Sequence, residues 1–587
     1  MKKHILKLSS LILTLLLVNT GCEKDFLERY PLDEISNETF WNTEADMAVY
    51  NNGLYAMTIN NDNVPILQGH STGNNIQSIW FQDNFSDNFA PVGVGYMQLV
   101  RSGLQVVPTT ASSQTFGYKG WDFIRAINVG LENYPKTKVT DAIRNKYIGE
   151  ARLFRGWFYA EKVSKFGDVP YLDKPLNIDS PELYSGRTPR LEVMDKVLED
   201  LNAAVAGLPA SWGDGGNPGR LNRWAALLIK SRVCLFEGTF RKYHGLPNPE
   251  KWLTEAATAS KELIDKGPYS LHTTGNPNAD YSNFQRLADF TGNKEVMYWK
   301  KYASGILFNN VERTVHRTIG GATKSFVEDY LCKDGLPISL SPLYKGDKVL
   351  EDVFANRDPR LRQTILLPED NATLVFDVNR TYPRITGMAG GNTSTTGYHI
   401  IKYFNPNIGP GFNTGITPAL VMRFGEALLN YAEAQAELGK ITQTDLDISI
   451  NKLRTRVGMP HMKLDAIPVD PRYANEGISP LLVEIRRERR IELFGEGFRY
   501  NDLKRWKQGK KLAQPTLGIL FDAAAKAKYV GAKIETSIDP ASGKTYIDVY
   551  KGTDIANPVF DESKHYYWPI PLGSIAQNPN IKQNPGW

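Results

Sequence analysis

The sequence predicts a mostly α-helical fold, in which a tetratricopeptide-like helical scaffold carries long loops and short-strand insertions. Apolar residues recur three and four positions apart in several windows, as they do on one face of a helix. Some of these windows end at glycine or Gly-Pro, which commonly stop helices. Small alanines lie beside large aromatic residues on the same faces, which suits close packing of helix on helix.

Residues 1–21 form a predicted lipoprotein signal peptide. Three lysines give it a positive start, and residues 11–18 form a short apolar core. A membrane-spanning helix needs about 20 apolar residues, so a secretory signal fits this segment better. Cys22 directly follows Gly21, as at a bacterial lipoprotein cleavage site where the thiol receives a lipid. The alternative is cleavage at another small residue. We expect a single body, 22–587, anchored through Cys22.

The predicted scaffold lies mainly at 40–60, 117–268 and 420–508. Five apolar stripes mark its helices: Tyr147, Ala151, Phe154 and Phe158; Met194, Val197, Leu201 and Ala204; Ala225, Ile229, Val233 and Phe236; Trp252, Ala256, Ala259 and Leu263; and Ala427, Tyr431, Ala434 and Leu438. Gly238 is an expected stop for the third helix. The windows 222–238 and 250–266 are expected to pair as one tetratricopeptide-like unit, although no strict repeat period is visible.

The regions 60–116, 271–420 and 510–567 are rich in Gly, Asn, Pro, Ser and Thr, with short apolar runs such as 296–299. This composition predicts loops with short strands. Long irregular loops on a rigid scaffold commonly carry function. We therefore expect ligand and partner contacts in these three regions.

A dense run of charge spans residues 484–499. Four of its glutamates are spaced four residues apart, on one helix face: Glu484, Glu488, Glu492 and Glu496. Like charges at this spacing repel one another, so other groups must neutralise them. A metal site or a catalytic carboxylate pair is one interpretation. The favoured interpretation is an ion network between helices. Its expected partners are Arg423, Arg499 and Arg505.

Composition excludes several other classes. The net charge of +5 falls to +2 without the three signal-peptide lysines, which gives no electrostatic case for a nucleic-acid partner. Three cysteines provide no disulfide framework. The eight histidines are scattered, and phosphate-loop and EF-hand motifs are absent from the sequence. We expect no cofactor, no metal ion and no catalytic residue.

One segment, 69–73, fits the G-x-S-x-G pattern of serine hydrolases, with Ser71 as the nucleophile. That motif needs a strand before it and a helix after it, and no alternation of strands and helices surrounds it here. We interpret the segment as a polar loop. A hydrolase acting on glycans or esters remains an alternative.

Segments spread along the whole body resemble the SusD/RagB family of outer-membrane lipoproteins from Bacteroidetes. In chain order they are Cys22 with Pro31, Thr39-Phe40-Trp41; Arg152, Arg155-Gly156-Trp157 and Phe166-Gly167-Asp168-Val169-Pro170-Tyr171; Asp334-Gly335; Arg357-Asp358-Pro359-Arg360-Leu361; Arg423, Glu426 and Tyr431-Ala432-Glu433-Ala434; Asn451, Arg454 and Arg456; Glu488-Arg489 through Arg505-Trp506; and Asn578-Pro579-Asn580 with Asn584-Pro585-Gly586. The shared order of these motifs makes the resemblance specific.

The resemblance implies a tetratricopeptide-containing fold and a binding role without catalysis. Members of this family are cell-surface lipoproteins of the outer membrane. They act as a lid over a SusC-like TonB-dependent β-barrel transporter and deliver oligosaccharides to it. Some branches carry peptides, so a peptide-uptake lipoprotein is an alternative here. A further alternative is an assembly protein that joins the barrel without a ligand of its own.

Ligand-binding candidates are loop aromatics with amide or guanidinium groups nearby, because sugars present C–H faces and hydroxyls. The first loop region offers Trp80, Phe81, Asn84 and Tyr96, and the second offers Phe308, Asn309, His316 and Arg317. The resemblance places the family's ligand contacts in these two regions. Its starch-binding member carries tryptophans there, whereas none follows Asp87 or precedes Phe326 here, which argues against starch.

Overall fold

The structure is a computed structural model. It describes residues 40–58, 65–71, 78–112, 117–213, 219–317, 320–370, 383–389, 393–405, 407–408 and 411–587. The predicted signal peptide and Cys22 lie outside these residues. Within them, no helix is both long and apolar enough to cross a membrane.

The described chain is mostly helical, and the predicted fold class is confirmed. The helices are α2 Glu44–Met57, α3 Tyr96–Arg101, α4 Trp121–Asn133, α5 Asp141–Phe166, α6 Arg190–Gly207, α7 Arg223–His244, α8 Pro249–Lys266, α9 Asp280–Gln285, α10 Val311–Arg317, α11 Lys324–Asp329, α12 Leu350–Phe354, α13 Pro359–Thr364, α14 Phe424–Glu437, α15 Gln443–Asp447, α16 Ile450–Arg456, α17 Pro480–Glu492, α18 Arg499–Arg505, α19 Ala523–Lys528 and α20 Leu572–Gln577.

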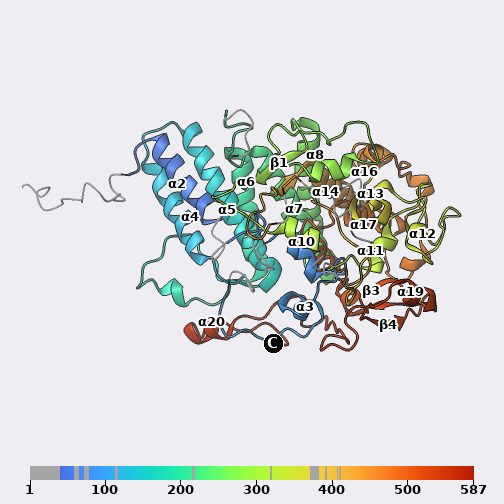
Figure 1. Ribbon diagram of the computed structural model, residues 1–587. Coiled ribbons are helices and arrows are strands. Elements are labelled where there is room, and N and C mark those ends of the chain that lie inside the picture. The colour runs from blue at the N-terminus through green and yellow to red at the C-terminus, as the bar shows by residue number, and fades with distance from the viewer. Residues whose placement is uncertain are drawn as a thin grey trace, which may run out of the picture.

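The long helices form a stack in which each packs on the next. α5 packs on α6, α6 on α7, α7 on α8, α8 on α14, and α14 on α17 (Figure 1). All five predicted apolar stripes lie on helices of this stack, except that Leu438 directly follows α14. Their side chains are buried, mostly in one continuous core, apart from the half-buried Phe236 and Leu438. Burial of these stripes, at about 25 cal/mol per Å² of apolar surface, is what holds the scaffold together.

Gly238 differs from its predicted role. It was expected to end a helix, but α7 continues to His244 and is closed by Gly245, whose φ is +71°. A Cβ atom at Gly238 would lie 2.8 Å from Cγ of Leu253 on α8. The glycine therefore permits the close approach of α7 and α8, a need that the periodicity of a single helix does not reveal.

Two small antiparallel sheets accompany the helices. β1 Val296–Lys300 pairs with β2 Ala419–Arg423, and the first strand confirms the one predicted at 296–299. β3 Leu517–Leu520, β4 Glu535–Ile538 and β5 Thr545–Asp548 form the second sheet in the order β3-β5-β4. Figure 1 shows this second sheet with α19 at the lower right, at the opposite end of the molecule from α2 and α4.

The C-terminal segment returns to the N-terminal half. The Trp568 backbone N–H donates to the Lys165 carbonyl (2.7 Å), and Asn584 Nδ2 donates to the Phe166 carbonyl (2.9 Å). Both carbonyls belong to the last turn of α5, whose final carbonyls have no partner inside the helix. α20 lies beneath the N-terminal helices in Figure 1. The two ends of the described chain are therefore packed as one body.

Candidate functional site

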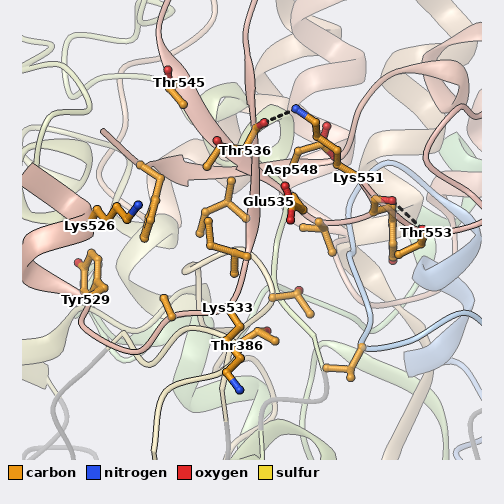
Figure 2. A pocket seen from close by; sticks show the side chains of 18 of the residues that line it. Thr386, Lys526, Tyr529, Lys533, Glu535, Thr536, Thr545, Asp548, Lys551 and Thr553 are labelled. Carbon is orange, nitrogen blue, oxygen red and sulfur yellow. Dashed lines mark hydrogen bonds between the residues drawn. The ribbon is translucent and has the colours of Figure 1, made fainter. Parts of the chain in front are cut away.

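A cavity with a volume of about 1040 Å³ lies beside the β3-β5-β4 sheet. We call it the sheet cavity. Its walls come from the loop 91–94, from Thr386 and Thr395, and from the segment 521–553 that contains α19, β4 and β5. In Figure 2, Lys526 and Tyr529 line one side and Lys551 and Thr553 line the other. The volume is at the upper end of the range of small-molecule sites.

The sheet cavity presents a mixed polar lining. Hydroxyl groups come from Thr386, Thr395, Thr536, Thr545 and Thr553. Two of these regions are fixed by hydrogen bonds: Lys551 Nζ donates to the Thr536 carbonyl (2.6 Å), and Thr553 Oγ1 donates to the Tyr550 carbonyl (2.6 Å). Hydroxyls and ammonium groups of this kind can bind the hydroxyls of a sugar.

Most charged groups of the sheet cavity are exposed, whereas Asp548 is buried. Lys526, Lys533 and Glu535 make no ion pair with any described residue. The Lys533 backbone N–H donates to the Thr386 carbonyl (2.7 Å), which joins these two parts of the cavity wall. Tyr529 is 8% exposed, and burial raises its pKa to about 12, so the phenol stays protonated as a hydrogen-bond donor.

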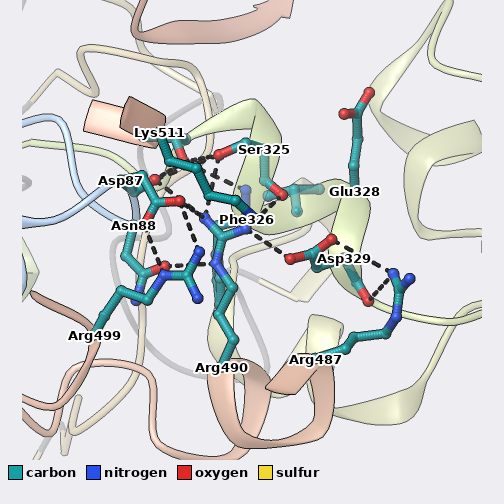
Figure 3. A network of polar contacts seen from close by, with 12 residues as sticks. Asp87, Asn88, Ser325, Phe326, Glu328, Asp329, Arg487, Arg490, Arg499 and Lys511 are labelled. Atoms are coloured by element: carbon teal, nitrogen blue, oxygen red, sulfur yellow. Dashed lines mark hydrogen bonds and ion pairs between the residues drawn. The ribbon is translucent and has the colours of Figure 1, made fainter. Parts of the chain in front are cut away.

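A second cavity of about 410 Å³ lies near the same sheet. We call it the Arg101 pocket. It is lined by Asp87 and Arg101, by 323–329 of α11, by the end of β4, and by side chains such as Arg490 and Lys511. Figure 3 shows the polar cluster that forms one of its walls.

That wall is a buried cluster of paired charges, the Asp87–Asp329 cluster. Arg490 contacts Asp87 (3.1 Å) and Asp329 (2.6 Å), Arg499 contacts Asp87 (2.7 Å), and Arg487 contacts Asp329 (3.4 Å) (Figure 3). Burial raises the pKa of both aspartates, but the arginines outweigh it and hold each pKa well below its usual range. The two carboxylates are therefore ionised and satisfied at neutral pH.

The predicted ion network between helices is confirmed around α17. Glu492 accepts from Arg423 (2.7 Å), Arg456 (2.7 Å) and Arg360 (3.0 Å), and all four side chains are buried. Further members of this α17 ion network are Glu295, Asp358, Glu484, Glu488, Glu496, Lys402 and Arg454. Of the three expected partners, Arg423 is correct. Arg499 pairs with Asp87, and Arg505 pairs with Glu433 and Asp502.

The carboxylates of the α17 ion network form ion pairs between elements of the scaffold, and the described residues show no metal site there. No group of three or more His, Cys, Asp or Glu side chains in this part of the protein is arranged to hold a metal ion. The segment 65–71 before the G-x-S-x-G serine contains no strand, and Ser71 is buried. Residues 72–73 of that motif lie outside the described chain.

The aromatic candidates of the first loop region lie mainly in the core. Trp80 is 2% exposed and packs edge-on against Phe89 and Tyr403, with centroid distances of 5.2 and 5.5 Å. Phe81 and Asn84 are buried beside it in the 3₁₀ turn Trp80–Phe85. Their burial argues against direct ligand contact, because no ring face is open to solvent. Tyr96 is half-buried, and its hydroxyl accepts from Gln105 Nε2 (2.6 Å).

The candidates of the second loop region differ in how far they are buried. Asn309 is buried, and its side chain accepts from the Val311 backbone N–H at the start of α10 (3.1 Å). Phe308 is half-buried. His316 and Arg317 have backbones in α10, but their side chains lie outside the described part. The structure brings neither these residues nor those of the first region into the sheet cavity lining.

Sequence reasoning missed Phe412 and the sheet cavity itself. Phe412 is 65% exposed, and the Arg313 guanidinium lies 5.2 Å from its ring centroid. Asn413 beside it exchanges hydrogen bonds with Asn310 (2.8 Å each). The position of Phe412 directly after Gly411, in a glycine-rich stretch, was the available signal. The sheet cavity is lined by segments more than four hundred residues apart in the sequence. A local sequence pattern cannot predict that such segments meet.

Two models of known protein families match this chain. A model of the SusD family matches residues 284–587, just over half of the chain. This chain belongs to the SusD family. A second model, described as starch-binding and associating with the outer membrane, matches residues 25–235. The resemblance seen in the sequence is therefore confirmed, and association with the outer membrane follows from the family description.

Individual SusD-like proteins resemble the whole chain. SusD-like protein P38 of Formosa agariphila is 24% identical over 528 residues, covering 88% of this chain and 94% of that protein. The crystal structure of a SusD-like carbohydrate-binding protein from Bacteroides fragilis aligns with a TM-score of 0.71 at 22% identity, covering 93% of this chain and 100% of the other. A laminarin-binding SusD-like protein aligns with a TM-score of 0.59 at 18% identity, with the same coverage. These structural likenesses show that the fold is shared.

Proposed function

We propose that this SusD-family protein binds oligosaccharides at the cell surface and delivers them to a SusC-like TonB-dependent transporter. The observation that carries the proposal is the sheet cavity, a large open site lined by hydroxyl groups and exposed charged side chains on a SusD fold. Carbohydrate binding by the Bacteroides fragilis protein of similar fold supports this reading. We assign the protein no catalytic step.

The anchor in this proposal is a lipid on Cys22, with residues 1–21 removed. The described helices include none able to cross a membrane, and a lipid would hold the body at the outer membrane that the family description names. Replacing Cys22 with alanine should release the protein from the membrane fraction. Retention of Cys22→Ala there would overturn the anchor.

Tyr96, Phe308 and the exposed Phe412 are proposed as additional ligand contacts, because each keeps part of a ring open to solvent. Trp80, Phe81, Asn84 and Asn309 are given a packing role. An electron-rich ring face stacks on the C–H face of a sugar. A small effect of Phe412→Ala on sugar affinity would remove that residue from the site.

Titration calorimetry of the mature chain with defined oligosaccharides and oligopeptides tests the proposal. We expect saturable heat with one glycan class and at least fivefold weaker binding in Lys533→Ala. The matched control is Lys452→Ala, which removes an exposed lysine on α16, away from the cavity lining. Binding of peptides alone would move the protein to a peptide-uptake role. Product release from an ester or glycan, lost in Ser71→Ala, would favour the hydrolase.

Delivery requires a separate test. Full-length lipoprotein should co-purify with a co-expressed SusC-like TonB-dependent barrel of the same organism, and the complex should retain the oligosaccharide found by calorimetry. A lipoprotein that binds sugar but never associates with such a barrel would limit the proposal to surface capture.

A further inference from the structure

Arg101 differs from the other buried cations around its pocket. It stands at the end of α3 and is 5% exposed. Its Nη2 donates to Thr516 Oγ1 (2.7 Å), and its guanidinium lies 5.8 Å from the Tyr550 ring centroid. Its Nε is buried without a hydrogen-bond partner. Among described residues, no carboxylate lies within ion-pair distance of it.

The neighbouring charges of the pocket are already paired. Arg490 and Asp87 belong to the Asp87–Asp329 cluster. Lys324 contacts Glu328 (2.7 Å) and Asp539 (3.1 Å), and Lys511 contacts Glu476 (2.5 Å). These carboxylates are therefore engaged elsewhere and are poor counter-ions for Arg101.

Asp548 is the acidic group to consider on the other side of Arg101. Both residues line a small adjoining cavity. The Asp548 carboxylate accepts from Ser537 Oγ (2.8 Å) and makes no ion pair with the guanidinium. Arg101 thus has the Thr516 hydroxyl and the ring and hydroxyl of Tyr550 as its described contacts, and none of these groups carries a negative charge.

A buried, unpaired guanidinium is costly. An arginine cannot escape the cost by losing its proton, because its pKa exceeds about 12. A cation–π contact offsets a part of the cost, and a buried charge otherwise needs an ionic partner. A guanidinium is best satisfied by the two oxygens of a carboxylate or by a sulfate, through parallel N–H···O bonds.

We propose that the Arg101 pocket binds an acidic saccharide, with Arg101 as the counter-cation of one uronic-acid carboxylate or sulfate ester. The pocket volume of 410 Å³ falls in the range of ligand sites. Gln514 supplies an amide for the sugar ring, and the hydroxyl oxygens of Ser325 and Ser537, whose protons are donated within the protein, can still accept hydrogen bonds from it. The other charges of the lining are paired with one another, so Arg101 is the cation that the pocket offers to an anionic group of the saccharide.

This inference rests on the proposed carbohydrate binding for the saccharide part of the ligand. The test uses calorimetry on the mature chain with three probes: an oligosaccharide with one uronic acid, the same oligosaccharide with a neutral hydroxymethyl group in place of the carboxylate, and inorganic sulfate. We expect the acidic probe to bind at least tenfold more tightly than the neutral one. The preference should weaken with added salt, as screening requires.

Variants at Arg101 separate charge from shape. Arg101→Gln should abolish the tenfold preference, and Arg101→Lys should keep part of it, since lysine retains the charge without the planar fork. Lys452→Gln, the matched charge change on α16, should leave the preference unchanged. Arg101→Gln should fold, because it removes an unpaired buried cation, and its melting temperature should no longer rise when the acidic probe is added.

The outcomes distinguish this inference from the proposed function. Equal binding of acidic and neutral probes by the native protein, or an unchanged preference in Arg101→Gln, would overturn the inference while leaving sugar binding intact. Binding of sulfate through Arg101, with no response to any saccharide, would overturn both the saccharide part and the proposed function.

Discussion

In the α17 ion network, Glu492 is fully buried and contacts three arginines, whereas in the sheet cavity Lys533 and Glu535 are exposed and pair with no described residue. Both regions use the same residue types. In the network, each charged side chain pairs with one or more others inside the scaffold. Removing one of them would leave its partners buried without that counter-charge. In the cavity, the charges keep their hydration and their freedom to meet a ligand. Charge therefore serves folding in one region and is available for binding in the other.

The largest effect should follow from breaking the network. Glu492→Gln leaves Arg360, Arg423 and Arg456 without their shared carboxylate, and we expect it to lower the free energy of unfolding by about 3–5 kcal/mol. Urea unfolding measured by circular dichroism gives this value. Glu535→Gln, the matched change in the sheet cavity, should alter it by less than about 0.5 kcal/mol. Equal losses in the two variants would abolish the comparison.

Trp80 tests where the scaffold ends and the binding loops begin. Because it is 2% exposed and packs against two rings, Trp80→Ala should cost about 3–5 kcal/mol of stability through a cavity in the core. Thermal unfolding and calorimetry of the same sample separate stability from affinity. A variant of native stability that has lost sugar binding would return Trp80 to the ligand site.

Two helix glycines, one closely packed and one not, test how tightly the scaffold helices pack. Gly238→Ala on α7 should lower stability by about 1–3 kcal/mol, because the added Cβ would lie 2.9 Å from the Leu253 backbone nitrogen. Gly53→Ala on α2 is the control, since nothing lies within 4 Å of its Cβ position. It should raise stability by about 0.5–1 kcal/mol through helix propensity. Stabilisation by both changes would show that α7 and α8 can separate freely.

Glu312 is a buried carboxyl that lacks the ion pairs of the network within the described chain. It is 1% exposed, and burial raises its pKa from 4.5 to about 8. The folded state therefore binds a proton that the unfolded state releases between these values, so this group's contribution is present below pH 4.5 and is lost as pH rises towards 8. The stability of the native protein minus that of Glu312→Gln should fall by at least about 1 kcal/mol between pH 5 and 7. A constant difference, measured by urea unfolding at each pH, would place a cation beside Glu312.

The sequence predicted the scaffold well because helix stripes are local. Tyr147, Phe154 and Phe158 share a face at helical spacing whatever packs against them, and all three are buried on α5. The loop-region candidates depended on distant segments. Trp80 stands before a polar stretch and resembled an exposed ring, yet Asp83 of that stretch accepts from the Gly495 backbone N–H (2.6 Å) and draws the turn into the core.

The two cavities could not be predicted from local sequence patterns, because their walls come from segments that are distant in the sequence. Arg101 and Thr516 are 415 positions apart and meet only in the folded protein. An arginine at the end of a short helix gives no sign that it will lack a carboxylate partner. Pairing, which decides whether a charge is structural or available, is a property of the whole fold.

The packing of the C-terminal segment against α5 constrains the order in which parts of the protein can fold. The carbonyls of Lys165 and Phe166 receive their partners from Trp568 and Asn584, and the latter contact spans 418 positions. Such distant contacts form late, since a long loop must close first. The end of α5 is therefore completed only after the segment 568–584 has been synthesised and has packed against it. Without that segment the carbonyls of Lys165 and Phe166 would lack these two partners.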